Sequence, residues 1–156
     1  MYDIIIIGAG PAGISAALYA KRANSNVLVL YNESTSLSKA EKIDNYYGFP
    51  RGITGKDLYE NGIKQAEELG IETKKIEVIQ IENLGNTFNV KTENGNYESK
   101  AIIISTGNKK VRPNIKGVKE FEGKGISYCA ICDAFFYRKK NVAVIGNRKI
   151  CNKRSK

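Results

Sequence analysis

The chain has 156 residues, of which 42% are hydrophobic and 26% are charged. This balance is typical of one globular domain and excludes disordered and low-complexity classes. No apolar run approaches the roughly 20 residues that a membrane-spanning helix needs. The N-terminal residues also lack the basic segment of a secretory signal. We therefore expect a soluble cytoplasmic protein with no membrane partner.

The net charge of +9 raises the question of a nucleic-acid partner. The excess of positive charge lies near the C-terminus, because residues 138–156 contain eight Lys or Arg and no Asp or Glu. No nucleic-acid recognition motif accompanies this charge. The alternative of a basic nucleic-acid binder would show salt-sensitive association with DNA, but the sequence predicts no nucleic-acid partner.

The chain contains three cysteines and no histidine. An odd cysteine count with one Cys-x-x-Cys is a poor disulfide scaffold but fits a redox pair in a reducing compartment. The lack of histidine removes Ser-His-Asp and Cys-His catalysis and most zinc chemistries, so we predict no metal site.

The first third of the chain predicts a βαβ unit followed by a long loop. Residues 3–7 read as a buried strand, residues 11–23 as a helix and residues 27–31 as a second buried strand. Residues 32–53 are polar and punctuated by Gly and Pro, and ordered loops of this length are usually functional.

A second helix is expected to begin near Thr54, whose hydroxyl can cap it, and to end at Gly70. The remaining elements are predicted to be strands. Apolar and polar residues alternate over residues 77–84, 88–92 and 97–99, which predicts a β-meander. Residues 101–105 predict a third buried parallel strand, and residues 141–145 predict a further buried strand.

A Gly-x-Gly-x-x-Gly motif at residues 8–13 lies between the first strand and the first helix. Gly8 permits a tight turn, Gly10 lets the backbone approach a pyrophosphate, and Gly13 lets the helix pack closely on the strand. The free N–H groups at the helix start favour phosphate binding. The alternative is a tight strand–helix turn that binds nothing.

The ribose-binding acid of such sites lies about 20 residues beyond the motif. Glu33 is at that distance from Gly13, and Asn32 directly precedes it, so either could hold the ribose. A solvated loop acid is the alternative reading of Glu33. The meander inserted before the third parallel strand favours FAD over a nicotinamide cofactor.

Cys129 and Cys132 have the spacing of a closable disulfide, and Asp133 beside them could move a proton as the disulfide opens. Two other readings remain open. The pair could be half of a zinc site completed by Cys151 and carboxylates, or an inert buried pair.

The glycine loop, the Thr106-Gly107 turn, CAICDAFFYRKK and VAVIG together resemble the low-molecular-weight thioredoxin reductases, a flavoprotein family. The resemblance extends from residue 1 to about residue 147. It implies an α/β, Rossmann-like FAD-binding fold (βαβ, meander insertion, parallel strand) over residues 1–112. An incomplete second nucleotide-binding domain with the Cys-x-x-Cys would then occupy residues 113–146, and a basic tail residues 147–156.

In this family electrons pass from NADPH to FAD, then to the disulfide and to thioredoxin, and the reductase is a homodimer. The resemblance implies a redox role for Cys129 and Cys132 and a proton-donor role for Asp133. Together with the motif positions, it gives the candidate FAD-binding residues Gly8, Gly10, Pro11, Ala12, Gly13, Asn32, Glu33, Leu37, Asn45, Thr106 and Gly107.

The sequence departs from the family pattern in three ways. Ser34-Thr35-Ser36-Leu37 stands where the family has Gly-Gly-Gln-Leu, and Ala134 replaces the usual Gly after Asp133. Both features are similar to a divergent branch in which ferredoxin can replace NADPH as the electron donor. The chain also has about half the family's length, so the expected NADPH site is absent.

The last ten residues are compatible with a one-base insertion after codon 147. The expected function is thus an FAD-dependent reductase of thioredoxin or a similar disulfide protein, here in a truncated or frameshifted, inactive form. The alternative is a stand-alone FAD-binding redox module that works with a separate partner chain.

Overall fold

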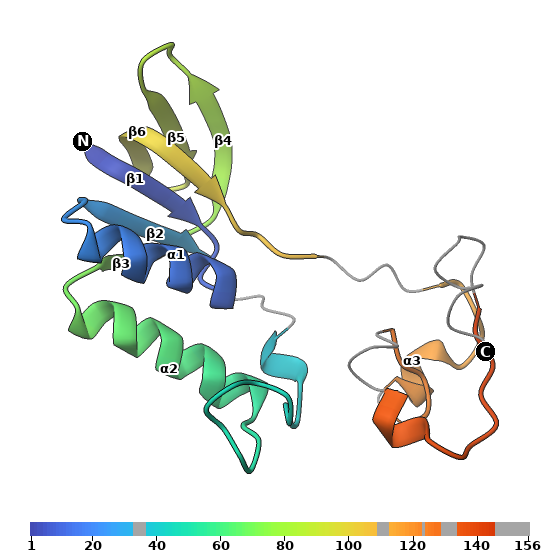
Figure 1. Cartoon of the computed structure of the whole chain (residues 1–156). Coiled ribbons are helices and arrows are strands. Elements are labelled where there is room, and N and C mark those ends of the chain that lie inside the picture. Colours follow the sequence, from blue (N-terminus) through green and yellow to red (C-terminus); the bar gives the residue numbers. More distant parts are fainter. Residues whose placement is uncertain (33–36, 109–112, 123, 129–133, 146–156) are drawn as a thin grey trace. The chain divides into compact units, whose positions relative to one another are not determined.

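The computed structural model describes residues 1–32, 37–108, 113–122, 124–128 and 134–145 (Figure 1). The chain divides into two compact units, Met1–Lys109 and Lys110–Lys156. The first unit holds a six-stranded sheet and two long helices, and the candidate site lies in it.

The sheet has the strand order β3-β2-β1-β6-β5-β4. Strands β3, β2, β1 and β6 are parallel to one another, whereas β5 runs antiparallel to β6 and β4 runs antiparallel to β5. The bounds are β1 Tyr2–Ile7, β2 Val27–Tyr31, β3 Glu72–Lys75, β4 Val78–Asn83, β5 Phe88–Thr92 and β6 Gly95–Ile104. A parallel half joined to an antiparallel meander confirms the predicted Rossmann-like α/β fold.

Helices α1 (Pro11–Arg22) and α2 (Gly55–Glu68) cover one face of the parallel half (Figure 1). Ile14 of α1 and Ala66 of α2 pack with Ile6 and Val29 in a buried cluster on that face. Ile5 and Leu28 point to the opposite face and pack with Val90 of β5. Burial on both faces explains why β1 and β2 are continuous apolar runs.

The predicted boundaries of α2 are confirmed by the residues at its two ends. Thr54 precedes α2, and its Oγ1 accepts a hydrogen bond of 3.0 Å from the N–H of Asp57. The chain leaves α2 through Gly70, whose φ of +69° is the left-handed conformation that favours glycine. The ammonium group of Lys21, at the end of α1, donates to the Gly70 carbonyl at 3.1 Å and ties the two helix ends together.

Two strands differ from the sequence prediction. Residues 97–99 and 101–105 were expected as separate strands, but β6 runs unbroken from Gly95 to Ile104. Its first half pairs with β5 while its second half pairs with β1, from Ser99 opposite Tyr2 onwards. Strand β3 was missed because its sequence, ETKK, has no apolar residue, and it forms through backbone pairing with β2 at the sheet edge.

The predicted buried strand at residues 141–145 is wrong. The structure assigns these residues to no helix or strand, and their apolar side chains are exposed, with Ile145 at 79%. A strand needs a neighbour for its backbone N–H and C=O groups. The described residues of the second unit contain only α3 (Val118–Phe121), a short 3₁₀ helix (Ala134–Tyr137) and an isolated bridge between Glu122 and Ile126, so they offer no such neighbour.

No helix among the described residues is both long and apolar enough to cross a membrane.

Candidate dinucleotide-binding site

The carboxyl ends of β1, β2 and β6 lie at one edge of the sheet, because these strands are parallel. The glycine turn (residues 8–13) follows β1, the long loop (residues 32–53) follows β2, and Ser105 follows β6. In open α/β sheets, ligands bind in the crevice outside this edge. The glycine turn, the start of the loop after β2 and Ser105 therefore lie at the edge of the sheet where such a fold binds its ligand.

Gly8 makes the turn out of β1 and packs against the end of β6. Its φ is +110°, and its N–H donates to the Leu30 carbonyl at 2.7 Å. A Cβ atom at Gly8 would lie 2.4 Å from the backbone oxygen of Ser105. Both the backbone conformation and the missing space therefore require glycine at this position.

Gly13 brings the first turn of α1 against the glycine turn. A Cβ atom there would lie 1.9 Å from the Gly8 carbonyl oxygen and 2.5 Å from Oγ of Ser105. No substitution with a side chain fits without moving the helix. This geometry confirms the predicted role of Gly13, which is to let the helix pack closely on the strand.

Gly10 differs from the other two glycines of the motif. Its φ of −71° suits any residue, and a Cβ atom at this position would meet no described atom within 4 Å beyond its sequence neighbours. The protein itself does not require glycine here. The space that a side chain would fill is open, which is the arrangement a closely approaching pyrophosphate needs.

The start of α1 is suited to an anion. Pro11 occupies the first helical position, Gly10 provides no side-chain cap, and the first turn has no acidic residue. The N–H groups of Ala12 and Gly13 belong to the first turn, where intrahelical acceptors are missing. Together with the helix dipole, these groups favour a phosphate.

Ser105 links β6 to the glycine turn, a contact that the sequence reasoning missed. Its Oγ lies 3.0 Å from the carbonyl oxygens of both Ile7 and Gly8, and its N–H donates to Ile7 at 2.8 Å. The sequence signal that could have indicated this contact is a small hydroxyl residue directly after an apolar strand. The predicted residues Thr106 and Gly107 follow it, and both are exposed.

Leu37 begins the 3₁₀ helix η1 (Leu37–Lys39), which packs on the start of α2. The N–H of Gly55 donates to the Ala40 carbonyl at 2.8 Å, and a Cβ atom at Gly55 would lie 1.8 Å from the Leu37 carbonyl oxygen. This contact fixes Leu37 at the N-terminus of α2, close to the edge where the parallel strands end.

Asn45 lies in a loop closed by paired backbone hydrogen bonds between Ile43 and Ile53, of 2.8 and 3.0 Å. Lys42 and Asp44 form an ion pair of 2.8 Å beside it. The structure places Asn45 exposed on this loop rather than in the glycine turn. Asn32 is exposed directly after β2, while Glu33 lies outside the described residues.

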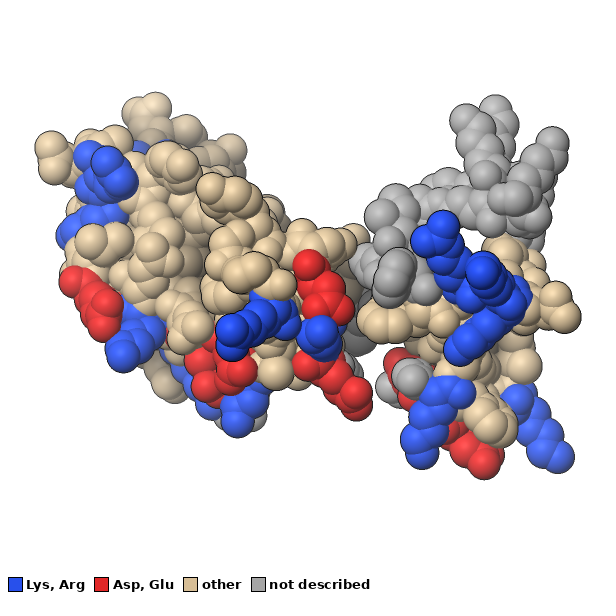
Figure 2. All heavy atoms as spheres, turned by 60° about the horizontal axis from the view of Figure 1, so that its bottom comes forward, with Lys and Arg blue, Asp and Glu red and all other residues tan. Residues whose placement is uncertain are grey.

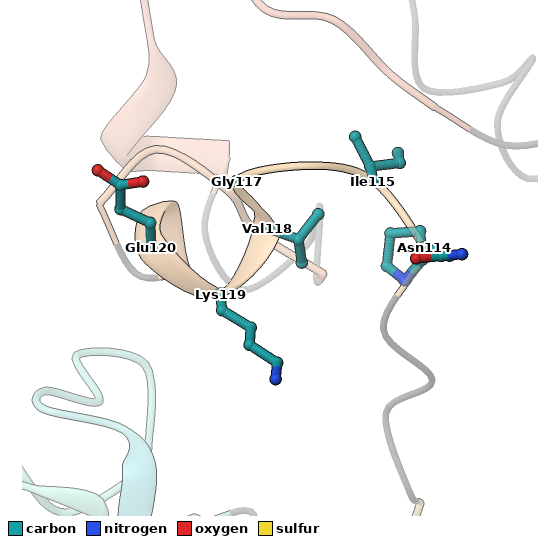
Figure 3. Close-up of a pocket in the computed structure, with 7 residues that line it drawn as sticks. Asn114, Ile115, Gly117, Val118, Lys119 and Glu120 are labelled. Atoms are coloured by element: carbon teal, nitrogen blue, oxygen red, sulfur yellow. The ribbon is translucent and has the colours of Figure 1, made fainter.

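The redox candidates Cys129, Cys132 and Asp133 also lie outside the described residues. A cavity of about 500 Å³ is present in the second unit, around α3 (Figure 3). Residues 113–115 and 117–120 line it, so it contains no predicted site residue. We assign it no ligand.

The two units differ in surface charge (Figure 2). Lys and Arg alternate with Asp and Glu over the visible face of the first unit. The described part of the second unit has six basic residues, Lys116, Lys119, Lys124, Arg138, Lys139 and Lys140, against Glu120 and Glu122. The described part of the second unit therefore has a net positive charge, whereas the face of the first unit in Figure 2 is mixed.

A family model for pyridine nucleotide-disulphide oxidoreductases matches residues 2–148. Together with the parallel sheet and its glycine turn, this match shows that the chain belongs to that family. Its relatives within the family include several bacterial thioredoxin reductases. The chain is 40% identical over 147 residues to the thioredoxin reductase of Treponema pallidum (strain Nichols). This alignment covers 93% of the chain and 48% of the Treponema protein.

Solved structures give the same result. The thioredoxin reductase of Streptococcus pyogenes MGAS5005 superposes with a TM-score of 0.80 at 38% identity, over 88% of this chain and 45% of that one. A ferredoxin-flavin thioredoxin reductase from Clostridium acetobutylicum gives a TM-score of 0.64 at 38% identity, over 87% and 48%. The chain thus spans about half the length of the relatives it matches.

Proposed function

We propose that the first unit binds FAD and that the chain is the flavin-binding part of a thioredoxin-disulphide reductase. The observation that carries this proposal is the contrast among the three glycines. Gly8 and Gly13 are required by the fold, whereas Gly10 faces open space and has no internal reason to be glycine. A dinucleotide that approaches the backbone closely supplies that reason.

The residues present fit FAD. The turn over residues 8–13, with Pro11 and Ala12, would hold the pyrophosphate at the start of α1, and Asn32 or Glu33 would hold the ribose. Leu37, Asn45, Thr106 and Gly107 would contact the rest of the cofactor. Bound FAD supplies two-electron transfer. NADPH, which the family implies as the electron donor, would bind outside the first unit.

We further propose that Cys129 and Cys132 form the redox pair. Two electrons open their disulfide, two protons convert it into two thiols, and Asp133 moves one of these protons. The thiols then pass both electrons to the disulfide of thioredoxin or a similar protein, and their own disulfide re-forms. This use of thiols suits the cytoplasm, where free thiols persist.

The electron donor is either NADPH or a small redox protein. The Clostridium structure is that of a ferredoxin-flavin enzyme, and the basic second unit favours an acidic protein partner. In this assignment residues 1–112 form the FAD domain, residues 113–146 begin the second domain, and the basic residues 147–156 have no assigned role. Homodimerisation is proposed from the family.

A second candidate is a flavin-binding redox module that works with a separate partner chain. Three apolar side chains that lie close together in the sequence, those of Val142, Val144 and Ile145, are exposed. A run of exposed apolar side chains is consistent with a surface that a further chain covers. This candidate predicts flavin binding without turnover until the partner is added.

An absorption spectrum tests the flavin proposal. The purified chain is incubated with FAD, desalted and scanned, and we expect flavin bands to remain with the protein. Riboflavin, which lacks the pyrophosphate, serves as the control and should be lost on desalting. A colourless protein after FAD treatment contradicts the proposal.

A further inference from the structure

We propose that Ser105 is a positioning residue that sets the glycine turn for dinucleotide binding. This inference rests on the proposed function, because it concerns how the FAD site is held in shape. Ser105 was not among the predicted site residues, and its contacts are made inside the protein rather than in the open space at Gly10.

The contacts of Ser105 join the ends of two neighbouring strands. Its N–H donates to the Ile7 carbonyl at 2.8 Å, which extends the pairing of β6 with β1 by one residue. Its hydroxyl lies 3.0 Å from the carbonyl oxygens of both Ile7 and Gly8. The side chain therefore contacts the backbone at the point where β1 leaves the sheet.

The hydroxyl also lies next to the start of α1. A Cβ atom at Gly13 would come within 2.5 Å of this oxygen, and one at Gly8 within 3.2 Å. One side chain thus touches both glycines that the fold requires. The hydroxyl oxygen is the Ser105 side-chain atom nearest to both positions, so a residue that keeps this oxygen keeps both contacts.

The bond to Gly8 has a consequence for the ligand side of the turn. In a planar trans peptide the C=O of Gly8 and the N–H of Ala9 point in opposite directions. A hydroxyl that holds the carbonyl towards Ser105 also fixes the amide plane between Gly8 and Ala9, directly before Gly10. The backbone that FAD approaches is thereby set before the ligand binds, which lowers the ordering cost of binding.

Ser105→Ala removes this donor without adding volume. The hydroxyl proton that the Ile7 and Gly8 carbonyl oxygens share at 3.0 Å is lost, while the backbone bond from the N–H of Ser105 to Ile7 remains. We expect the dissociation constant for FAD to rise about tenfold, the size expected when one such bond is lost. Ser105→Thr keeps the hydroxyl and should recover most of the affinity.

Ser99 provides a matched control on the same strand. It is fully buried, and its hydroxyl donates to the Ala101 carbonyl at 3.0 Å. Ser99 pairs with Tyr2 at the opposite end of β1, far along the strand from the glycine turn. Ser99→Ala should change the unfolding midpoint but leave the FAD dissociation constant within about twofold of wild type, because the site lies elsewhere.

The experiment measures FAD binding by flavin fluorescence for the wild-type chain and these three variants. Amide NMR spectra of the flavin-free chains provide a second readout, in which Ser105→Ala should shift the signals of residues 8–13 and Ser99→Ala should not. Equal FAD affinity of wild type and Ser105→Ala overturns this inference and leaves the proposed function intact. Equal losses in the Ala and Thr variants also overturn it. A wild-type chain that binds no FAD overturns both.

Discussion

Gly13 and Gly8 are separated by so little space that a methyl group on Gly13 would lie 1.9 Å from the carbonyl oxygen of Gly8. Gly13 belongs to α1 and Gly8 directly follows β1, so this approach sets how closely the helix packs on the sheet. The buried contact between Ile14 and the sheet depends on it. The motif is therefore part of the core as well as of the candidate site.

The first prediction concerns Gly13→Ala. The added methyl overlaps backbone that cannot move independently, so we expect a loss of about 3 kcal/mol or more in the free energy of unfolding, measured by urea denaturation. FAD should no longer be retained after desalting.

Gly62→Ala is the matched control for this substitution, since Gly62 also lies within a helix. Its Cβ would meet only Ile14 side-chain carbons at 3.8 Å, an ordinary contact distance. Replacing an interior helical glycine without a clash should stabilise the chain by about 0.5–1 kcal/mol. Equal effects of the two substitutions would contradict the packing role of Gly13.

The second prediction concerns Gly10→Ala, which separates binding from folding. A Cβ at this position has open space around it, so the free energy of unfolding should fall by less than about 1 kcal/mol, the cost of alanine at a helix N-cap. The methyl group would occupy the approach of the pyrophosphate, and the FAD dissociation constant should rise at least about tenfold. Unchanged FAD affinity in a stable variant would show that Gly10 does not face the ligand.

The glycine turn and the helix caps could be predicted because their signals are local. Gly8 and Thr54 act on residues a few positions away, and their backbone conformations follow from residue type. Strand β3 could not be predicted in this way. Its sequence, ETKK, contains no apolar residue, and it is a strand because β2 offers it an unpaired edge.

The errors at β6, Ser105 and residues 141–145 have the same physical origin. Whether an apolar segment is a strand, and where that strand ends, depends on partners distant in sequence. Ser105 contacts Gly8 across 97 positions, which no sequence pattern contains. At residues 141–145 the apolar pattern is present, but the described second unit provides no strand to pair with it.

The third prediction is a pH dependence at Asp3. Its carboxylate accepts hydrogen bonds from Lys100 and from the N–H of Asn26, both at 2.8 Å, and these contacts hold the pKa of Asp3 below its ordinary value. Because the folded chain binds this proton less readily, the contribution to stability is present above the ordinary pKa. It is lost as the pH falls through the lowered pKa of the folded state.

Urea denaturation of wild type and Asp3→Asn should therefore show a stability difference at pH 6 that closes as the pH falls to about 2. In a Lys100→Gln background the same difference should be smaller, because the main cause of the lowered pKa is gone. A difference that stays constant over this pH range would mean that the contacts of Asp3 do not depend on its charge.

The last prediction tests the proposed redox pair without requiring turnover. The chain has three cysteines. If Cys129 and Cys132 close a disulfide, the air-oxidised chain unfolded in denaturant should expose one thiol to alkylation, that of Cys151, and the reduced chain three. In Cys151→Ser the counts should be none and two, which identifies the paired residues. Mass spectrometry of the alkylated chains gives the counts directly.

Three reactive thiols in the air-oxidised wild type would identify the Cys-x-x-Cys as an inert pair. This result would remove the electron-transfer step from the proposed function. It would leave the proposal of FAD binding by the first unit unchanged.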